Sequence, residues 1–250
     1  MGGPTRIVGI DCATQPNNIG VCLAAYASPI LSVEQVFTCT SRKVMLERIA
    51  AFLSDGGPAV IALDAPLGWP VALSRELPQH QAGESVGSPA GIMFSRATDR
   101  YVKCVLDKTP LEVGANLIAR TALAALADLN AIREALGLPV PLAWQPGPVT
   151  AVVAIEVYPG ATERAYQVAE RSWAVTGRVN QELPTDNLHR RDAVLCAIAA
   201  SDFLEARVCR PPAEDRDVVR QEGWIWFPDI QRVRAEFPAT MPFSARTSSQ

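Results

Sequence analysis

The sequence predicts a single mixed α/β domain, because of the order in which strand and helix patterns follow one another along its 250 residues. Three β-forming segments with short connections come first, and this arrangement indicates an antiparallel meander. Helical and strand patterns then alternate, which is typical of a sheet covered by helices. A chain of this length can bury a sizeable core without disulfides or a structural metal.

The expected strands are short apolar segments bounded by turn residues. They cover residues 6–11, 21–26, 30–37, 59–63 and 151–158. The second and third are separated by Ser28-Pro29, a pair that favours a turn. The last two are continuous apolar runs, so we expect helices to cover them on both faces.

The expected helices carry apolar residues at helical spacing. They cover residues 44–53, 97–106, 113–136, 161–173 and 185–208. Residues 65–95 show no clear period and hold four prolines, so we expect a long loop insertion at about 65–98 that acts as a lid or binding loop. We expect residues 1–236 to form one domain and residues 237–250 to form a loose polar tail.

Composition excludes several classes of protein. Apolar residues make up 48% and charged residues 20%, which excludes a disordered or fibrous chain. The net charge of −3 gives no basic excess, so any nucleic-acid surface has to be local. The six cysteines form no C-x-x-C pair, and only two histidines occur, which argues against a zinc site. With no signal peptide or membrane span in the sequence, we expect a cytoplasmic protein with reduced thiols.

Three segments share one pattern, in which four mostly β-forming apolar residues are followed by an acid. The acids are Asp11, Asp64 and Glu156. Strand ends on one edge of an α/β sheet face a common crevice, so these carboxylates are expected to converge there. Converging carboxylates repel one another and resist desolvation, and therefore need a cation. Mg²⁺ and Mn²⁺ prefer such oxygen ligands.

Asp192 is the fourth candidate ligand. It shares a helix face with Leu188, Leu195 and Ala199, and an acid on an apolar stripe is costly unless it is paired. Each acid also has a structural interpretation. Asp11 and Asp64 could form turns, Glu156 could pair with an arginine such as Arg100, and Asp192 could cap a loop.

Six short segments resemble the domain of unknown function 429 family, whose members are predicted RNase H-like nucleases. They are residues 9–11, 63–70, 96–100, 156–159, 189–193 and 222–225. The resemblance spans roughly residues 5–230, and D-A-P-L-G-W-P and E-V-Y-P are its most specific parts. It implies an RNase H-like fold, with a mixed five-stranded sheet and helices on both faces.

The resemblance also implies an activity. Asp11, Asp64 and Asp192 match the acids that RNase H-like nucleases place on the first strand, a later strand and a late helix, with Glu156 as an extra acid. The implied reaction is phosphodiester hydrolysis by two Mg²⁺ or Mn²⁺ ions about 4 Å apart, without a side-chain base. The substrate would be nucleic acid or a small phosphodiester, and no obligate protein partner is evident. Lysine is scarce, whereas binding of a long duplex requires many basic side chains to neutralise its phosphates.

Five further residues are candidates for binding the substrate. They are Trp69, Arg96, Asp99, Arg100 and His189. The arginines could clamp a phosphate, since guanidinium forks match phosphate oxygens, or they could simply begin a surface helix that the aspartate caps. His189 could approach the metal edge or be an ordinary hydrogen-bonded helix residue. Trp69 could line the crevice.

Other patterns leave alternatives open. Residues 83–87 match G-x-S-x-G, but neither the strand before nor the helix after that a nucleophile elbow needs is present. Asp11, the polar turn after it and Gly20 resemble the phosphate loop of actin-like sugar kinases, which would make the protein a phosphotransferase. A nucleic-acid- or protein-binding module without catalysis is the third hypothesis. Trp224 and Trp226 could cover the core or stack on bases.

Overall fold

The computed structural model describes residues 3–114, 116–171, 179–180 and 182–236, in which five strands form one sheet. The strands are β1 (Thr5–Asp11), β2 (Gly20–Ala27), β3 (Ile30–Thr38), β4 (Ala59–Asp64) and β5 (Val152–Glu156). Their order is β3-β2-β1-β4-β5. Strands β1, β2 and β3 pair antiparallel, whereas β4 pairs parallel with both β1 and β5. This mixed five-stranded sheet is the fold class that the sequence predicted.

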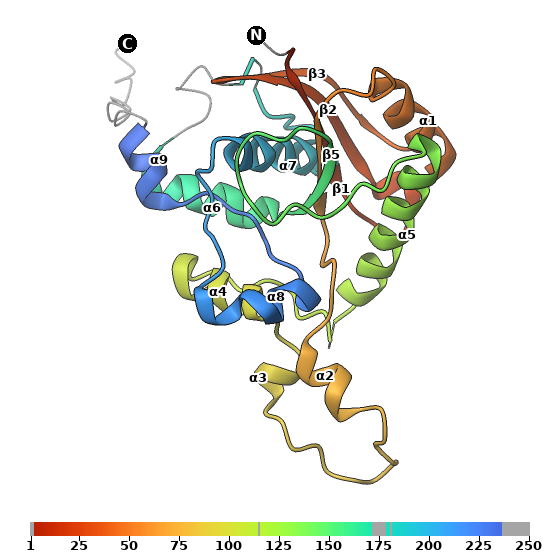
Figure 1. Ribbon diagram of the computed structural model, residues 1–250, viewed down its shortest axis with the longest axis vertical. Helices are drawn as coiled ribbons and strands as arrows, with labels where there is room; N and C mark the ends of the chain where they lie inside the picture. The colour runs from red at the N-terminus through yellow and green to blue at the C-terminus, as the bar shows by residue number, and fades with distance from the viewer. Residues whose placement is uncertain (1–2, 115, 172–178, 181, 237–250) are drawn as a thin grey trace, which may run out of the picture.

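Helices cover both faces of the sheet (Figure 1). The helices of the described residues are α1 (Arg42–Phe52), α2 (Val71–Glu76), α3 (Ala90–Met93), α4 (Ala97–Leu106), α5 (Ile118–Leu136), α6 (Pro159–Ala169), α7 (Leu188–Leu204), α8 (Arg216–Glu222) and α9 (Ile230–Glu236). Helices α6 and α7 lie on one side of the sheet, and α1 and α5 lie on the other. No helix in the described part of the chain is long and apolar enough to cross a membrane.

The predicted elements agree with the observed ones except at some ends. Helix α5 begins at Ile118 rather than residue 113, and α7 begins at Leu188 because the side chain of Asn187 accepts a hydrogen bond from the Arg190 amide. The predicted insertion contains α2 and α3, which extend away from the sheet (Figure 1). The tail from residue 237 and part of the end of the predicted 161–173 helix lie outside the described residues.

Alternation along the strands divides the core into two layers. Val8 and Ile10 of β1 pack in the layer with α1 and α5, whereas Ile7 faces α7. Neighbouring strands repeat this alternation in register, so each face of the sheet is apolar. Because the alternation continues to the end of each strand, the last residue of a strand also has a defined face of the sheet.

Two glycines let α7 approach the sheet closely. A Cβ on Gly9 would overlap the carbonyl oxygen of Ala193, and one on Gly20 would overlap that of His189. Gly20 is the register partner of Asp11, so the first turn of α7 lies directly beside the end of β1. These contacts fix the position of the acids and the histidine that α7 carries.

We expect Gly9→Ala to lower the free energy of unfolding by about 1–3 kcal/mol, because the new methyl group meets backbone atoms that cannot rotate away. Urea unfolding measures the change. Gly91→Ala is the matched control, since a Cβ at Gly91 meets nothing within 4 Å. Equal stability of the two variants would contradict the tight packing of α7 on β1.

Candidate active site

Asp11 and Asp64 lie side by side at the ends of two neighbouring strands. They are direct partners in the parallel pairing of β1 and β4. Gly9 and Ala62, two residues earlier in each strand, lie on the face covered by α7. Side chains alternate along a strand, so both carboxylates share that face. Asp192, near the start of α7, is the third acid beside them and acts on the pKa of each.

Asp64 is the least compensated of these acids. Burial raises the pKa of Asp64 well above its usual value, and the negative charges of Asp11, Asp192 and Glu156 raise it further. Within the described residues, its carboxylate has neither a hydrogen-bond donor nor an ion-pair partner. A partly buried carboxylate facing other carboxylates is unfavourable unless a proton or a cation neutralises it.

Asp11 and Asp192 have partners but are still perturbed. Burial raises the pKa of Asp11 to about 6, although His189, whose Nδ1 lies 2.7 Å from Asp11 Oδ2, opposes the rise. Burial also raises the pKa of Asp192, against the attraction of Arg191, whose guanidinium lies 3.2 Å away. His189 thus lies beside Asp11, and a role for it in binding substrate stays a prediction.

A cavity of about 250 Å³ opens beside the acids. Its wall includes Asp11, Asp64 and Glu156, together with apolar residues from the segments before and within α5. Tyr158 and Thr121 also line the cavity, and Lys108 Nζ lies 5.6 Å from the centre of the Tyr158 ring. We did not predict these three. Tyr158 belongs to the E-V-Y-P motif, which was the available signal, whereas Thr121 and Lys108 lie in no motif.

Arg96 lies at the centre of a buried network of charges. Its side chain is only 1% exposed. It donates to both carboxylate oxygens of Asp99, with Nη2 2.8 Å from Oδ1 and Nε 3.1 Å from Oδ2. Its Nη2 and Nη1 also lie 2.8 Å and 3.1 Å from the Glu156 carboxylate oxygens, and Nη1 donates to the Glu222 carbonyl. Burial would lower the pKa of Arg96, but the charges of Glu156 and Asp99 raise it.

The same network ties distant segments together. Glu156 Oε2 accepts a hydrogen bond from the Leu67 amide, and the Glu222 carboxylate accepts from the amides of Val71 and Ala97. The base of the insertion, the start of α4, the end of β5 and the end of α8 therefore share one set of buried ionic contacts. Gly223 permits the closest approach, because a Cβ there would be 3.2 Å from Arg96 Nη1 and even nearer to Glu156.

These contacts bear on several predicted site residues. The structural alternative for Glu156, pairing with an arginine, is what the geometry shows, but the partner is Arg96 rather than Arg100. The Arg96 and Asp99 side chains are occupied by each other and by the protein. Arg100 is exposed and donates to the Ser95 carbonyl. A role for these three in binding substrate stays a prediction.

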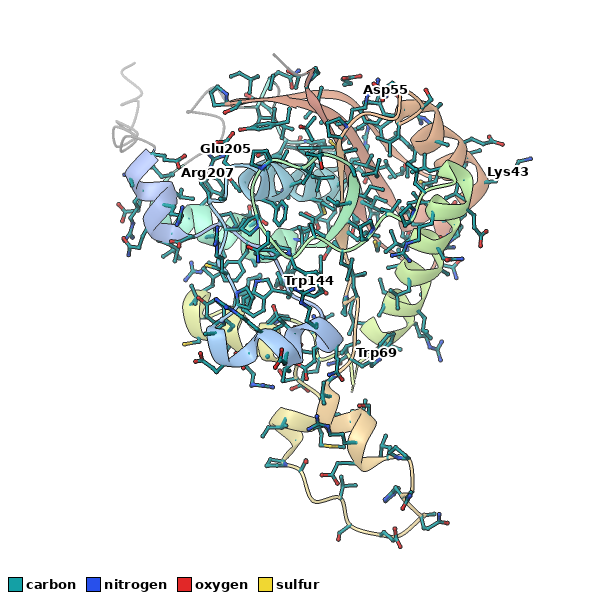
Figure 2. All side chains as sticks on the ribbon, in the orientation of Figure 1. Lys43, Asp55, Trp69, Trp144, Glu205 and Arg207 are labelled. Atoms are coloured by element: carbon teal, nitrogen blue, oxygen red, sulfur yellow. The ribbon has the colours of Figure 1, made fainter. Side chains whose placement is uncertain are left out.

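The tryptophans divide into two groups. Trp69 is half-buried, stands where the insertion leaves the body of the protein, and is not part of the cavity wall (Figure 2). Trp224 and Trp226 are 1% and 2% exposed and pack in the core, where Trp226 meets Phe203 edge to face. Core cover is therefore the role of the segment at 224–227 that the structure supports.

The acids suit a hard cation in charge and in donor type. Carboxylate oxygens are the ligands that Mg²⁺ and Mn²⁺ prefer, and Asp64 lacks any other neutralising group in the described chain. Among the described residues, however, no three His, Cys, Asp or Glu side chains stand close enough together to form a metal-binding group. The acids therefore suit the cation in charge and in donor type but not in spacing. A bound ion would have to draw the carboxylates closer together.

Comparison with known proteins adds a resemblance in shape. No family model matches the chain, and no curated protein does. Among solved structures, the chain is similar to T. thermophilus RuvC in complex with a Holliday junction substrate. That match has a TM-score of 0.38 at 14% identity and covers 81% of this chain and 95% of the other.

Proposed function

We propose that the protein is a divalent-metal-dependent phosphodiesterase or nuclease, with Asp11, Asp64 and Asp192 as its metal-binding carboxylates. The observation that carries this proposal is Asp64, whose carboxylate has no partner among the described residues and lies beside two other acids at the edge of a cavity. Such an arrangement costs free energy in the absence of a cation, so binding one is the simplest use of it. The resemblance of the motifs to the domain of unknown function 429 family supports the same assignment.

The chain's own residues then have distinct roles. Bound Mg²⁺ or Mn²⁺ would supply neutralisation of a substrate phosphate and activation of a water molecule. His189 holds the Asp11 carboxylate in place from α7, and Arg191 does the same for Asp192. Glu156, predicted as a fourth ligand, is held by Arg96 and the Leu67 amide, so we propose that it anchors the cavity wall.

The first test is a Mg²⁺ and Mn²⁺ titration of wild-type protein and of Asp11→Asn, followed by thermal melting. An ion that binds only the folded state raises the melting temperature, by about 5–10 °C at about 100 times its dissociation constant. We expect this rise in the wild type and its loss in Asp11→Asn. Asp55→Asn is the control, because Asp55 is exposed, pairs with Arg6 and lies at the other end of the sheet (Figure 2).

A positive titration leads to a hydrolysis assay with single-stranded and duplex DNA and RNA and with a chromogenic small phosphodiester. Metal-dependent hydrolysis that Asp64→Asn abolishes would support the proposal and identify the substrate class. If millimolar ion shifts neither the wild type nor Asp11→Asn, the metal-dependent mechanism is wrong and the acids are structural.

A further inference from the structure

A second cavity of about 280 Å³ lies away from the acids and shares no wall residue with their cavity. Trp144, on the segment between α5 and β5, forms one side of it (Figure 2). Arg216 and Arg220, four residues apart on α8, and Arg210 from the segment before α8 form another. Residues four apart lie on one face of a helix, so the two α8 arginines lie next to each other there.

Acidic side chains of the described residues do not neutralise the three arginines of this cavity. Among the described residues, none of them has a hydrogen-bond or ion-pair partner, whereas arginines such as Arg6 and Arg42 pair with acids. The wall of the cavity contains no acidic side chain, although Glu214, Asp215 and Asp217 are close in sequence. Three cations around one cavity repel one another, and an anion bound between them would remove that repulsion.

Trp144 adds a second chemical feature. The guanidinium of Arg220 lies over its ring, with Cζ 4.9 Å from the ring centre, so the aromatic contact orients a group whose donors are otherwise unused. Guanidinium forks match phosphate oxygens, and the flat outer face of the Arg220 guanidinium, which Trp144 supports, suits stacking with a base. The cavity volume is close to the lower end of the ~300–1,000 Å³ typical of ligand pockets, which is room for one nucleotide unit.

We propose that this cavity binds one nucleotide unit, either a free nucleotide or one nucleotide of a single strand, with its phosphate on Arg210 and Arg216 and its base stacked on Arg220, which Trp144 supports. The site is separate from the acids, so this proposal does not depend on the proposed metal-dependent activity.

The test measures binding without divalent ion, in EDTA, so that a failure of the metal site cannot affect it. The ligands are adenosine 5′-monophosphate, adenosine, inorganic phosphate and a fluorescein-labelled single-stranded oligothymidylate. Calorimetry or fluorescence anisotropy measures their binding. The variants are the double substitution Arg216→Gln and Arg220→Gln, the single substitution Trp144→Ala, and Arg75→Gln as an exposed arginine on α2. Thermal melting checks that each variant is folded.

We expect the double substitution to weaken binding by about tenfold or more, since each charged hydrogen bond contributes about 1.5–3 kcal/mol, and Arg75→Gln to leave it unchanged. Trp144→Ala should weaken the nucleotide more than inorganic phosphate. If the double substitution weakens the binding of adenosine 5′-monophosphate, the ligand is a free nucleotide. If it weakens only the binding of the oligothymidylate, the ligand is a single strand. Phosphate bound as tightly as the nucleotide, no binding at millimolar ligand, or binding that the double substitution leaves intact would overturn the proposal.

Discussion

Arg96→Ala is expected to lower the free energy of unfolding by about 3–5 kcal/mol, the cost of removing one partner from a buried ionic network. The substitution leaves Glu156 and Asp99, which are 3% and 2% exposed, without their counter-charge. Burial already raises the pKa of Glu156, and Arg96 is what opposes that rise.

Urea unfolding of Arg96→Ala, compared with Arg100→Ala, measures this effect. Arg100 lies four residues later on the same helix and is exposed, so its removal should change stability little. Arg96→Lys should recover only part of the loss, because an ammonium cannot donate to Asp99 and Glu156 with the same planar fork. Similar stabilities for Arg96→Ala and Arg100→Ala would show that the buried network contributes nothing.

The stability of the metal-free protein should fall by about 3 kcal/mol more in the wild type than in Asp11→Asn as the pH rises from about 4 to about 7. The pKa of Asp11 is raised, chiefly by burial, from its ordinary value of 3.8 to about 6. The folded state therefore keeps a proton that the unfolded chain has lost. This stabilisation is fully present below pH 3.8 and is lost as the pH passes 6, at about 1.36 kcal/mol per pH unit.

Denaturant unfolding in EDTA across that pH range gives the measurement. Asp11→Asn also removes a negative charge that raises the pKa of Asp64, so the difference between the two proteins contains the titration of Asp11 and its effect on Asp64, which act in the same direction. Asparagine does not titrate, and Asp11→Asn should be the more stable of the two at neutral pH. Parallel pH profiles for the two proteins would mean that Asp11 titrates normally and that the acids are well solvated.

Much of the fold could be predicted because its strands are local patterns. The β-forming runs ending at Asp11 and Asp64 are visible in the sequence, and the prediction that these strand ends meet is confirmed by the direct pairing of the two residues. The first residues of α5 and α7 were predicted less accurately. Their first turns depend on contacts such as the Asn187 cap, which the apolar periodicity does not contain.

The register of the sheet determines which of the acids share a face, and the sequence pattern does not contain this information. Asp64 pairs with Asp11, whereas Glu156 pairs with Leu63, one residue earlier. A shift of one residue places a side chain on the opposite face, so Glu156 leaves the face of the three aspartates despite sharing their pattern. Arg96 shows the same limit, since its burial depends on segments up to 126 residues away.

The contact between Asp11 and His189 joins residues 178 positions apart. Long-range contacts of this kind form late, because loop closure is costly until the intervening chain is ordered. During synthesis, β1 and β2 emerge long before α7, so Asp11 and Gly20 are then exposed to solvent without their helix. The group of three aspartates can be completed only once α7 has docked, because Asp192 and His189 both lie on that helix.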